Sequence, residues 1–356
     1  MNSIKMYLNR RWRVARWRFS KFIFVAFGIV GFSEGSESDA KLLGPFEKPQ
    51  PQELRIPRQS EPFDEVEALN GAFSSPEHCA RVPNGLWIEV DGGGECIRYY
   101  AHGFADGENP IALVYFSGDV MLRTSQGARH ISQTYMVASP LKIEKDLAAW
   151  SVEAQRPAIF LARPGIYGSS GDHNLRRRPR EIELMDRALD VLKESFNISS
   201  FILAGHSGGG QIAAALLNKR SDIDAAAISS GLVSVKQVAA YWEYRREIPG
   251  KLLDDVTTYY NPVDEIGNIR RDPKPAIYVI SDPEDRSVPF YSQLYYVRRL
   301  RSIGLNPHHI YAHAPPPQRH LLAEHAKRAA SLLARGRSEK DVRRALQEID
   351  LLQVKS

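Results

Sequence analysis

The chain has 356 residues, of which 43% are hydrophobic and 25% are charged, a composition typical of globular proteins. Its net charge of +5 comes from residues 1–33, which hold seven Lys and Arg and no acid, so the remaining residues carry −2. This remainder lacks the basic excess of nucleic-acid-binding proteins, and we expect no nucleic-acid partner.

The first 33 residues have the pattern of an export signal. The basic stretch precedes the apolar run "FIFVAFGIVGF", residues 22–32, which is shorter than an ordinary membrane span. Cleavage after Ser33 would give a periplasmic or secreted protein. If the segment is not cleaved, it anchors the chain to a membrane.

Residues 34–78 are rich in Pro, Glu, Ser and Gln, as in "EKPQPQELRIPRQSEPFDE". This composition predicts a poorly ordered linker, with the folded domain covering residues 79–356. Cys79 and Cys96 are the only cysteines. Cys79 precedes the predicted hairpin "LWIEVDGGGECIRYY", and Cys96 opens its second strand. In an oxidising compartment a disulfide would tie these two parts together, although two unpaired thiols are equally compatible with the sequence.

From Leu86 onward, apolar strand-like runs alternate with amphipathic helix-like stretches. The expected strands are residues 86–90, 96–103, 111–118, 158–165, 200–207, 225–231, 276–282 and 308–314. The expected helices are residues 178–196, 210–220, 290–304 and 320–336. Two antiparallel strands followed by this alternation predict an α/β fold, with an eight-stranded, mostly parallel sheet and helices on both faces. Ligands bind such sheets at the C-terminal ends of the strands.

Ser207 lies in "AGHSGGG", between a predicted strand and a predicted helix. The pattern Gly205-x-Ser207-x-Gly209 allows a tight turn that exposes the serine hydroxyl beside the amides of the helix start. A phosphate-binding glycine turn is the alternative, but no Lys follows at P-loop spacing. A nucleophilic serine also needs a base and an acid from later strand ends.

The later strand ends supply both groups. The strand "AIYVISD" continues into "PEDRSVP", and "HHIYAHAPPPQRHLL" contains histidines before a helix. With these motifs the chain resembles the α/β-hydrolases from about residue 82 to about residue 335. In that family the order is nucleophile, acid, histidine, and the acid commonly occurs as Asp-x-x-Val-Pro. The resemblance implies Ser207 as nucleophile, Asp285 as acid and His320 as base.

Each of these roles has a competitor in the sequence. Asp282 is nearer the strand end than Asp285 but lacks the Val-Pro offset. His313 lies early, directly at a strand end, and His325 falls within the helix, where we expect it to be solvated. His206 is expected to have a structural role. The pair His308 and His309 has no Cys or carboxylate at metal spacing, so we expect no metal site.

The family resemblance also implies an oxyanion hole. Its donors would be the amide of Gly208 and the amide of Asp119 in "YFSGDV", where the family often has His-Gly-x and this chain has Ser117-Gly118-Asp119. Gly118 would allow the bend and border the substrate. The Asp119 side chain either fixes the turn or binds a cation on the substrate.

Three further segments bear on substrate binding. The loop "ARPGIYGSSGDH" carries Arg163 and Tyr167, which either contact substrate or only shape the loop. Residues 231–274 are too long for a simple connection and predict a small cap over Ser207. The basic run "RRRPR", residues 176–180, is expected to be a solvated helix start or, less simply, an anion-docking face.

The sequence therefore predicts an exported serine hydrolase that cleaves an ester or amide through an acyl-enzyme. No cofactor is expected, and the partner is a small-molecule or peptide acyl substrate. "YNPVDEIGNIRRDPKPAIYVISDPEDRSVP" resembles part of the prolyl-oligopeptidase-like enzymes, which makes a serine peptidase one alternative. A non-catalytic binding protein of the same fold is another.

Overall fold

The computed structural model describes residues 50–249, 252–253 and 255–355. The predicted export segment, residues 1–33, and the first part of the expected linker, residues 34–49, lie outside the described residues.

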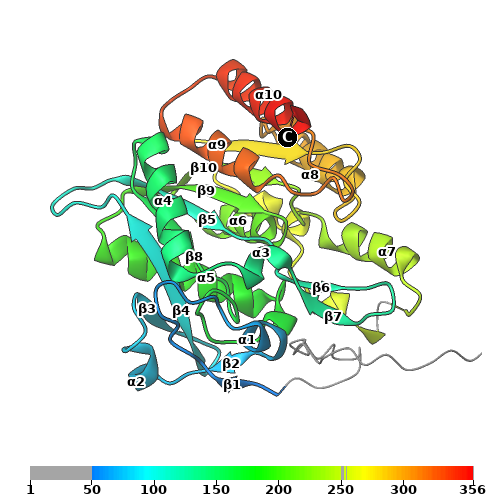
Figure 1. Cartoon of the computed structure of the whole chain (residues 1–356). Coiled ribbons are helices and arrows are strands. Elements are labelled where there is room, and N and C mark those ends of the chain that lie inside the picture. The colour runs from blue at the N-terminus through cyan, green and yellow to red at the C-terminus, as the bar shows by residue number, and fades with distance from the viewer. Residues whose placement is uncertain (1–49, 250–251, 254, 356) are drawn as a thin grey trace, which may run out of the picture. The chain divides into compact units, whose positions relative to one another are not determined.

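An eight-stranded sheet forms the centre of the domain (Figure 1). Its strands are β3 (Gly85–Val90), β4 (Gly93–His102), β5 (Ile111–Phe116), β8 (Ala158–Leu161), β9 (Ser200–His206), β10 (Ile223–Ser229), β11 (Ala276–Ser281) and β12 (His308–Tyr311). The order is β12-β11-β10-β9-β5-β8-β4-β3. Pairing is antiparallel between β3 and β4 and between β4 and β8, and parallel from β8 to β12. This confirms the predicted strands and the mostly parallel sheet.

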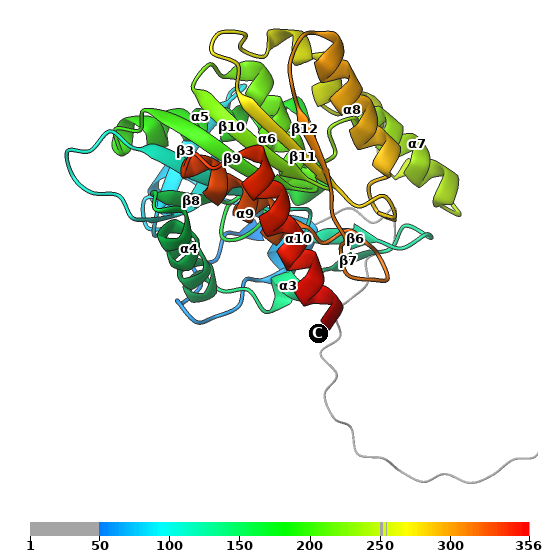
Figure 2. The same ribbon diagram turned by 90° about the horizontal axis from the view of Figure 1, so that it is seen from above.

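Helices cover both faces of the sheet (Figure 2). The main helices are α4 (Pro140–Ala154), α5 (Pro179–Ser195), α6 (Gly208–Lys219), α8 (Phe290–Ser302), α9 (Ala323–Ala334) and α10 (Glu339–Lys355). One apolar core joins the sheet to α4 and α9, and a second joins its other face to α5, α6 and α8. No helix in the described part of the chain is both long and apolar enough to cross a membrane.

Residues 50–78 are folded onto the domain, which corrects the expectation of a linker up to residue 78. They form β1 (Gln52–Glu53), α1 (Glu65–Asn70), β2 (Ala72–Phe73) and α2 (Pro76–Cys79). The Asp64 carboxylate caps α1, and Ala72 exchanges two main-chain hydrogen bonds with Gly171. The prediction from composition was wrong because a few buried apolar side chains, among them Phe63 and Ala68, are enough to hold the segment against the domain.

Smaller elements connect the strands and main helices. They are the hairpin of β6 (Met121–Arg123) and β7 (Arg129–Ile131), the helices α3 (Gln133–Met136) and α7 (Val235–Arg245), and the 3-10 turns η1 (His173–Leu175), η3 (Val256–Thr258), η4 (Pro262–Asp264) and η5 (Ile266–Asn268). Within the expected cap region, residues 231–274, α7 and the last three turns are therefore the described regular elements.

Candidate active site

Ser207 occupies a strained turn between β9 and α6. Its backbone has φ 53° and ψ −116°, a conformation that a non-glycine residue adopts rarely and at a cost. The surrounding main chain holds this conformation: the Ser207 amide donates to the carbonyl of Ser229 at 2.9 Å, and the Ser207 carbonyl accepts from the amides of Gln211 and Leu232. The side chain is thereby fixed at the C-terminal end of β9.

The glycines around Ser207 are required by close packing. A Cβ atom on Gly209 would lie 2.1 Å from the carbonyl oxygen of Phe116, and one on Gly205 would lie 2.4 Å from the carbonyl oxygen of Gly209. Neither distance is possible for real atoms, so α6 could not start this close to β5 and β9 with any other residue. The sequence "GHSGG" is therefore explained by the approach of helix and strand.

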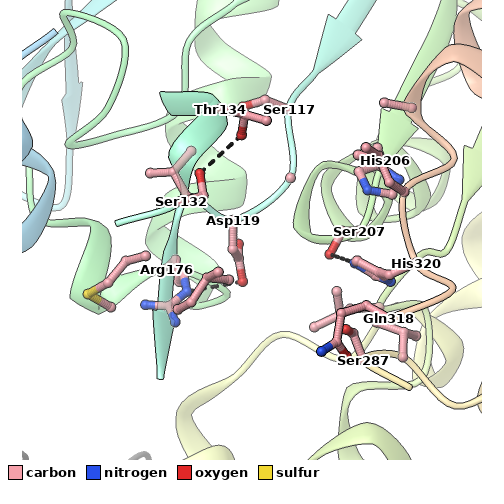
Figure 3. Close-up of a pocket in the computed structure, with 18 of the residues that line it drawn as sticks. Ser117, Asp119, Ser132, Thr134, Arg176, His206, Ser207, Ser287, Gln318 and His320 are labelled. Atoms are coloured by element: carbon pink, nitrogen blue, oxygen red, sulfur yellow. Dashed lines mark hydrogen bonds and ion pairs between the residues drawn. The ribbon is translucent and has the colours of Figure 1, made fainter. Parts of the chain in front are cut away.

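His320 and Asp285 complete a hydrogen-bonded chain with Ser207. The Nε2 atom of His320 lies 3.0 Å from the Oγ atom of Ser207, and its Nδ1 atom lies 2.8 Å from the Oδ2 atom of Asp285. The Oδ1 atom of Asp285 accepts from the amides of Ser287 and Val288 at 2.8 and 2.9 Å, which fixes the carboxylate. The structure thus brings together the three side chains that the sequence assigned to nucleophile, acid and base. Figure 3 shows two of these groups, Ser207 and His320, joined by their hydrogen bond.

The competing residues are engaged elsewhere. Asp282 is buried and accepts hydrogen bonds from the amides of Glu284 and Ala314, so it fixes the loop after β11. His313 is exposed, and its amide donates to Asp350. His325 is fully buried, with Nε2 2.9 Å from the Oδ1 atom of Asp350, so the expectation that it is solvated was wrong. Asp350 lies on α10, a helix that was not predicted from the sequence.

His206 lies beside the proposed base without bonding to it. Its Nδ1 atom is 3.1 Å from the Oγ atom of Ser229, and its ring centroid is 5.0 Å from that of His320. Burial, followed by the nearby His320, lowers the pKa of His206 well below its usual range, so the ring is neutral at neutral pH. This agrees with the structural role expected for His206.

Backbone amides are available next to Ser207. Gly208 is the first residue of α6, where amides have no acceptor within the helix. The amide of Asp119 donates to no acceptor among the described residues, and Asp119 borders the cavity. Gly118 allows this approach, because a Cβ atom on it would lie only 3.2 Å from the Cβ atom of Ser207. These are the two amides that the sequence proposed for an oxyanion.

The Asp119 carboxylate belongs to a buried cluster of charges. Its Oδ1 atom lies 2.8 Å from Nη1 of Arg163, and its Oδ2 atom accepts from Nε of Arg176 at 3.1 Å and from Nη2 of Arg177. Burial alone would raise the pKa of Asp119, but these three guanidinium groups hold it well below its usual range. The carboxylate therefore stays ionised and binds cations of its own chain, a role that neither the turn-fixing nor the substrate-binding expectation named.

This cluster decides between the two roles left open for Arg163 and corrects the expectation for the basic run at residues 176–180. Arg163 is completely buried and also donates to Glu181 at 2.9 Å and to the carbonyl of Ser117, so it shapes the site from beneath and is not accessible to a substrate. Arg176 and Arg177 are buried too, so the start of "RRRPR" is not a solvated helix start. The sequence pattern did not reveal that Asp119, more than 50 residues away, is their partner.

A cavity of about 870 Å³ opens above Ser207 and His320, a size that fits small-molecule sites. In Figure 3, Asp119 and Arg176 lie on one side of this cavity, and Ser207 and His320 lie on the other. Tyr167 lines it, with φ 54°, and its carbonyl accepts a hydrogen bond from the hydroxyl of Tyr100. Tyr167 thus both borders the cavity and shapes its loop.

The expected cap contributes one wall of the cavity. Trp242, Arg245 and Arg246 of α7 and its following residue line it, as does Leu232. The sequence reading missed these arginines and also Arg286, which stands inside the motif Asp285-x-x-Val288-Pro289. The consecutive arginines in "YWEYRRE" were the available signal.

The described residues contain no cluster of three or more His, Cys, Asp or Glu that could hold a metal ion. His308 pairs with Glu339, and His309 lies 3.1 Å from the hydroxyl of Ser281. Each of the two imidazole rings thus contacts a polar group of the protein.

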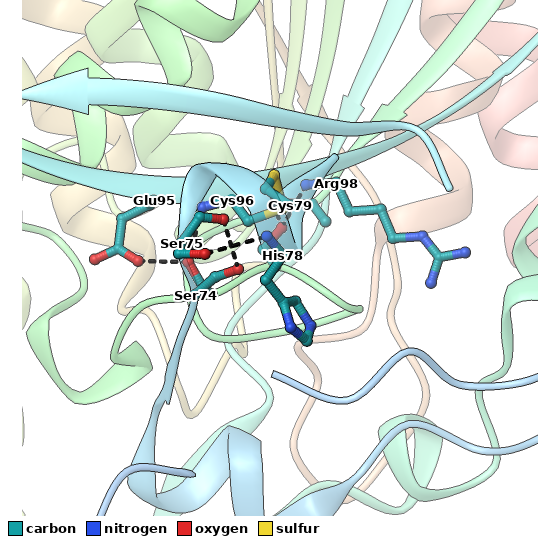
Figure 4. Close-up of a disulfide and its surroundings, with 10 residues drawn as sticks. Ser74, Ser75, His78, Cys79, Glu95, Cys96 and Arg98 are labelled. Carbon is teal, nitrogen blue, oxygen red and sulfur yellow. Dashed lines mark hydrogen bonds between the residues drawn. A yellow bond between two sulfur atoms is a disulfide. The ribbon is translucent and has the colours of Figure 1, made fainter. Parts of the chain in front are cut away.

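Cys79 and Cys96 form a disulfide (Figure 4). It joins the end of α2 to β4, and both residues are buried in a small apolar cluster with Leu54, Ala72 and Val82. The open choice between a bonded pair and two free thiols is thus decided in favour of the bond.

The strand order and connections are those of the α/β-hydrolase fold. No family model matches the sequence, and no curated protein matches it. Similar solved structures include an esterase from Pyrococcus furiosus, at 13% identity over 75% of this chain and 96% of the esterase, with a TM-score of 0.49. Est1E from Butyrivibrio proteoclasticus is 12% identical over 71% of this chain and 98% of its own, with a TM-score of 0.46.

An acylaminoacyl peptidase from Pyrococcus horikoshii is also similar. It is 13% identical over 71% of this chain, with a TM-score of 0.47, and the chain spans 40% of that peptidase. Each of these likenesses is too distant to assign an activity to this chain.

Proposed function

We propose that the protein is a serine hydrolase that cleaves a carboxylic ester through an acyl-enzyme. The observation that carries the proposal is the hydrogen-bonded chain from Ser207 through His320 to Asp285 at the floor of an open cavity. Such a chain activates a hydroxyl that is otherwise a weak nucleophile.

In the first half-reaction the Oγ atom of Ser207 attacks the ester carbonyl, and Nε2 of His320 takes the hydroxyl proton. Asp285 orients the ring through Nδ1–H and stabilises the imidazolium that forms. The amides of Gly208 and Asp119 donate to the oxyanion. When the tetrahedral intermediate collapses, the bond to the leaving alkoxide breaks, and His320 returns the proton to the alcohol.

In the second half-reaction, water attacks the acyl-enzyme while His320 takes one of its protons. The intermediate collapses to a carboxylic acid, and the proton returns to Ser207. His320 acts as the base in each half-reaction, because its Nε2 atom faces the Ser207 hydroxyl.

Turnover of chromogenic substrates tests this function. The folded protein is expected to hydrolyse short 4-nitrophenyl esters, and Ser207→Ala is expected to lower kcat by about 10⁴-fold or more, because no other group supplies the nucleophile. Aminoacyl 4-nitroanilides serve as the comparison. Faster cleavage of the anilides would favour a peptidase, and ester cleavage retained in Ser207→Ala would contradict the assignment.

We also propose that the protein is exported, as the pattern of residues 1–33 suggests. The Cys79–Cys96 disulfide supports this, since such bonds persist in oxidising compartments. In the native host, a mature chain beginning near residue 34 outside the cytoplasm is expected, or a full-length chain in the membrane fraction if the segment is an anchor. Full-length protein in the cytosol with free thiols would contradict the proposal.

A further inference from the structure

Two arginines at the cavity have no acidic partner within residues 50–249, 252–253 and 255–355. Lys and Arg outnumber Asp and Glu among the lining residues by eight to three. Asp119 is held by its own three arginines, and Glu324 pairs with Lys327. By contrast, Arg245 and Arg286 are exposed and have no carboxylate within ion-pair distance among the described residues.

The two arginines are held on a common support. The hydroxyl of Tyr241 and the guanidinium of Arg245 both donate to the carbonyl oxygen of Arg286, and the indole of Trp242 donates to the carbonyl oxygen of Ser287 at 2.7 Å. The Arg245 guanidinium also lies over the Tyr241 ring, 5.3 Å from its centroid. Helix α7 and the loop after Asp285 thus form one unit that holds the Arg245 guanidinium and the main chain of Arg286 beside the cavity.

A second set of hydrogen bonds joins this unit to the β6–β7 hairpin. The amide of Glu247 donates to the carbonyl of Ser125, and the Ser125 hydroxyl donates to the Glu247 carboxylate at 2.9 Å. Ser125 lies between β6 and β7, so the residues after α7 are joined to that hairpin, which lies near α7 in Figures 1 and 2. Glu247 is the first acid after Arg245 in the sequence, and its carboxylate already accepts this hydrogen bond from Ser125.

The position of Arg286 relates it to the proposed base. Arg286 follows Asp285 directly, and its amide donates to the carbonyl of Gln318, two residues before His320, at 2.9 Å. Gln318 and Ser287 lie next to His320 in Figure 3. Because His320 returns its proton to the departing oxygen, the groups on its side of the cavity face the leaving group.

The cavity wall on β5, β8 and α4 has a different character. There Tyr115, Leu147, Trp150 and Phe160 line the cavity with buried apolar surface, and α4 adds one residue of each charge, Lys142 and Asp146. One cavity therefore offers an apolar wall and a cationic wall, and an acyl group suits the first while an anion suits the second.

We propose that the natural substrate is an ester whose alcohol part carries an anionic group, which Arg245 and Arg286 bind at the mouth of the cavity. This inference rests on the proposed ester hydrolysis and specifies its substrate class. An alcohol bearing a carboxylate or a phosphate has the required chemistry, since guanidinium groups bind both with charge-assisted hydrogen bonds.

A matched pair of esters tests the inference. In 5-acetoxy-2-nitrobenzoate the leaving phenol carries a carboxylate, and in 5-acetoxy-2-nitrobenzamide the same position is neutral. The expected ratio of kcat/KM, anionic over neutral, is about tenfold at low salt, the effect of one charge-assisted hydrogen bond. The ratio is expected to fall toward one in 0.5 M NaCl, because exposed charges are screened.

Variants locate the effect. In Arg245→Gln/Arg286→Gln the ratio is expected to fall toward one, whereas Arg344→Gln, on the exposed surface of α10, is expected to keep the wild-type ratio. Circular dichroism and thermal unfolding verify that the variants are folded. A third ester, 4-nitrophenyl hemiglutarate, carries its carboxylate on the acyl side, and its neutral partner is the 4-nitrophenyl ester of monomethyl glutarate.

The outcomes separate the two proposals. Turnover of both acetoxy esters at equal rates, or a preference only for the acyl-side carboxylate, overturns the inference and leaves the proposed hydrolase standing. A preference that persists in Arg245→Gln/Arg286→Gln also overturns it. If the folded protein turns over none of the four esters, the proposed function fails and this inference fails with it.

Discussion

Asp119 is the centre of a buried cluster of charged side chains. Three guanidinium groups contact its carboxylate, which has 9% of its side-chain surface exposed. The same residue offers its amide next to Ser207, so the cluster also fixes the main chain of the proposed oxyanion hole. A buried charge pair that loses one partner is strongly destabilised, because the remaining charge stays out of water.

We therefore expect Asp119→Asn to lower the free energy of unfolding by about 3 kcal/mol, measured by urea denaturation at pH 7. The matched control is Asp264→Asn, which removes an exposed pair with Lys236 and is expected to cost less than about 1 kcal/mol. Equal losses in the two variants would contradict the account of the cluster.

His173 gives the cluster a dependence on pH. Its ring is completely buried, and burial followed by the positive charge of Arg163 lowers its pKa well below the ordinary 6.5. In the unfolded chain the ring takes up a proton as the pH falls through about 6.5, and in the folded protein it does not. Stability from this residue is thus complete above that pH and is lost as the pH falls below it.

Between pH 7 and pH 5, the free energy of unfolding of the wild type is expected to fall by about 2 kcal/mol more than that of His173→Gln. Urea denaturation at several pH values measures the difference. Parallel curves for the two proteins would mean that the folded state protonates His173 as readily as the unfolded state does.

At the scale of elements, the junction of β9 and α6 depends on glycine. We expect Gly209→Ala to lower the free energy of unfolding by about 2 kcal/mol or more, because its Cβ atom would meet the main chain of β5. Gly267→Ala is the control, since nothing lies within 4 Å of its added Cβ atom, and it is expected to stay within about 0.5 kcal/mol of the wild type. Thermal and urea unfolding of both variants compare the two sites.

The strands and four of the six main helices were predictable because each has a regular apolar pattern and a clear turn signal, whereas α4 was not expected. The eight sheet strands fall where apolar runs end in glycine or polar residues, and α5, α6, α8 and α9 follow the expected stretches. The segment before residue 79 was not predictable, because its strands have two residues each and depend on partners such as Gly171, which is distant in sequence. Helix α10 likewise depends on tertiary contacts, among them Asp350 with His325.

At the scale of the whole domain, the resemblance to the α/β-hydrolases implied the order of nucleophile, acid and histidine along the chain, and strand ends in a parallel sheet meet at one edge. What surrounds the triad could not. The burial of Arg163 and the positions of Arg245 and Arg286 result from contacts between segments far apart in sequence, such as Arg245 with Arg286 and Arg163 with Asp119. The proposed chemistry therefore starts from the sequence, and the proposed substrate class starts from the packing.

The central claim is that Ser207 is a nucleophile activated by His320. Labelling with a fluorophosphonate probe, followed by peptide mass spectrometry, tests it directly. The account predicts one adduct, on Ser207, that disappears in Ser207→Ala and forms at least about 100-fold more slowly in His320→Ala. Folded protein without an adduct on Ser207, or with undiminished labelling in His320→Ala, would contradict it.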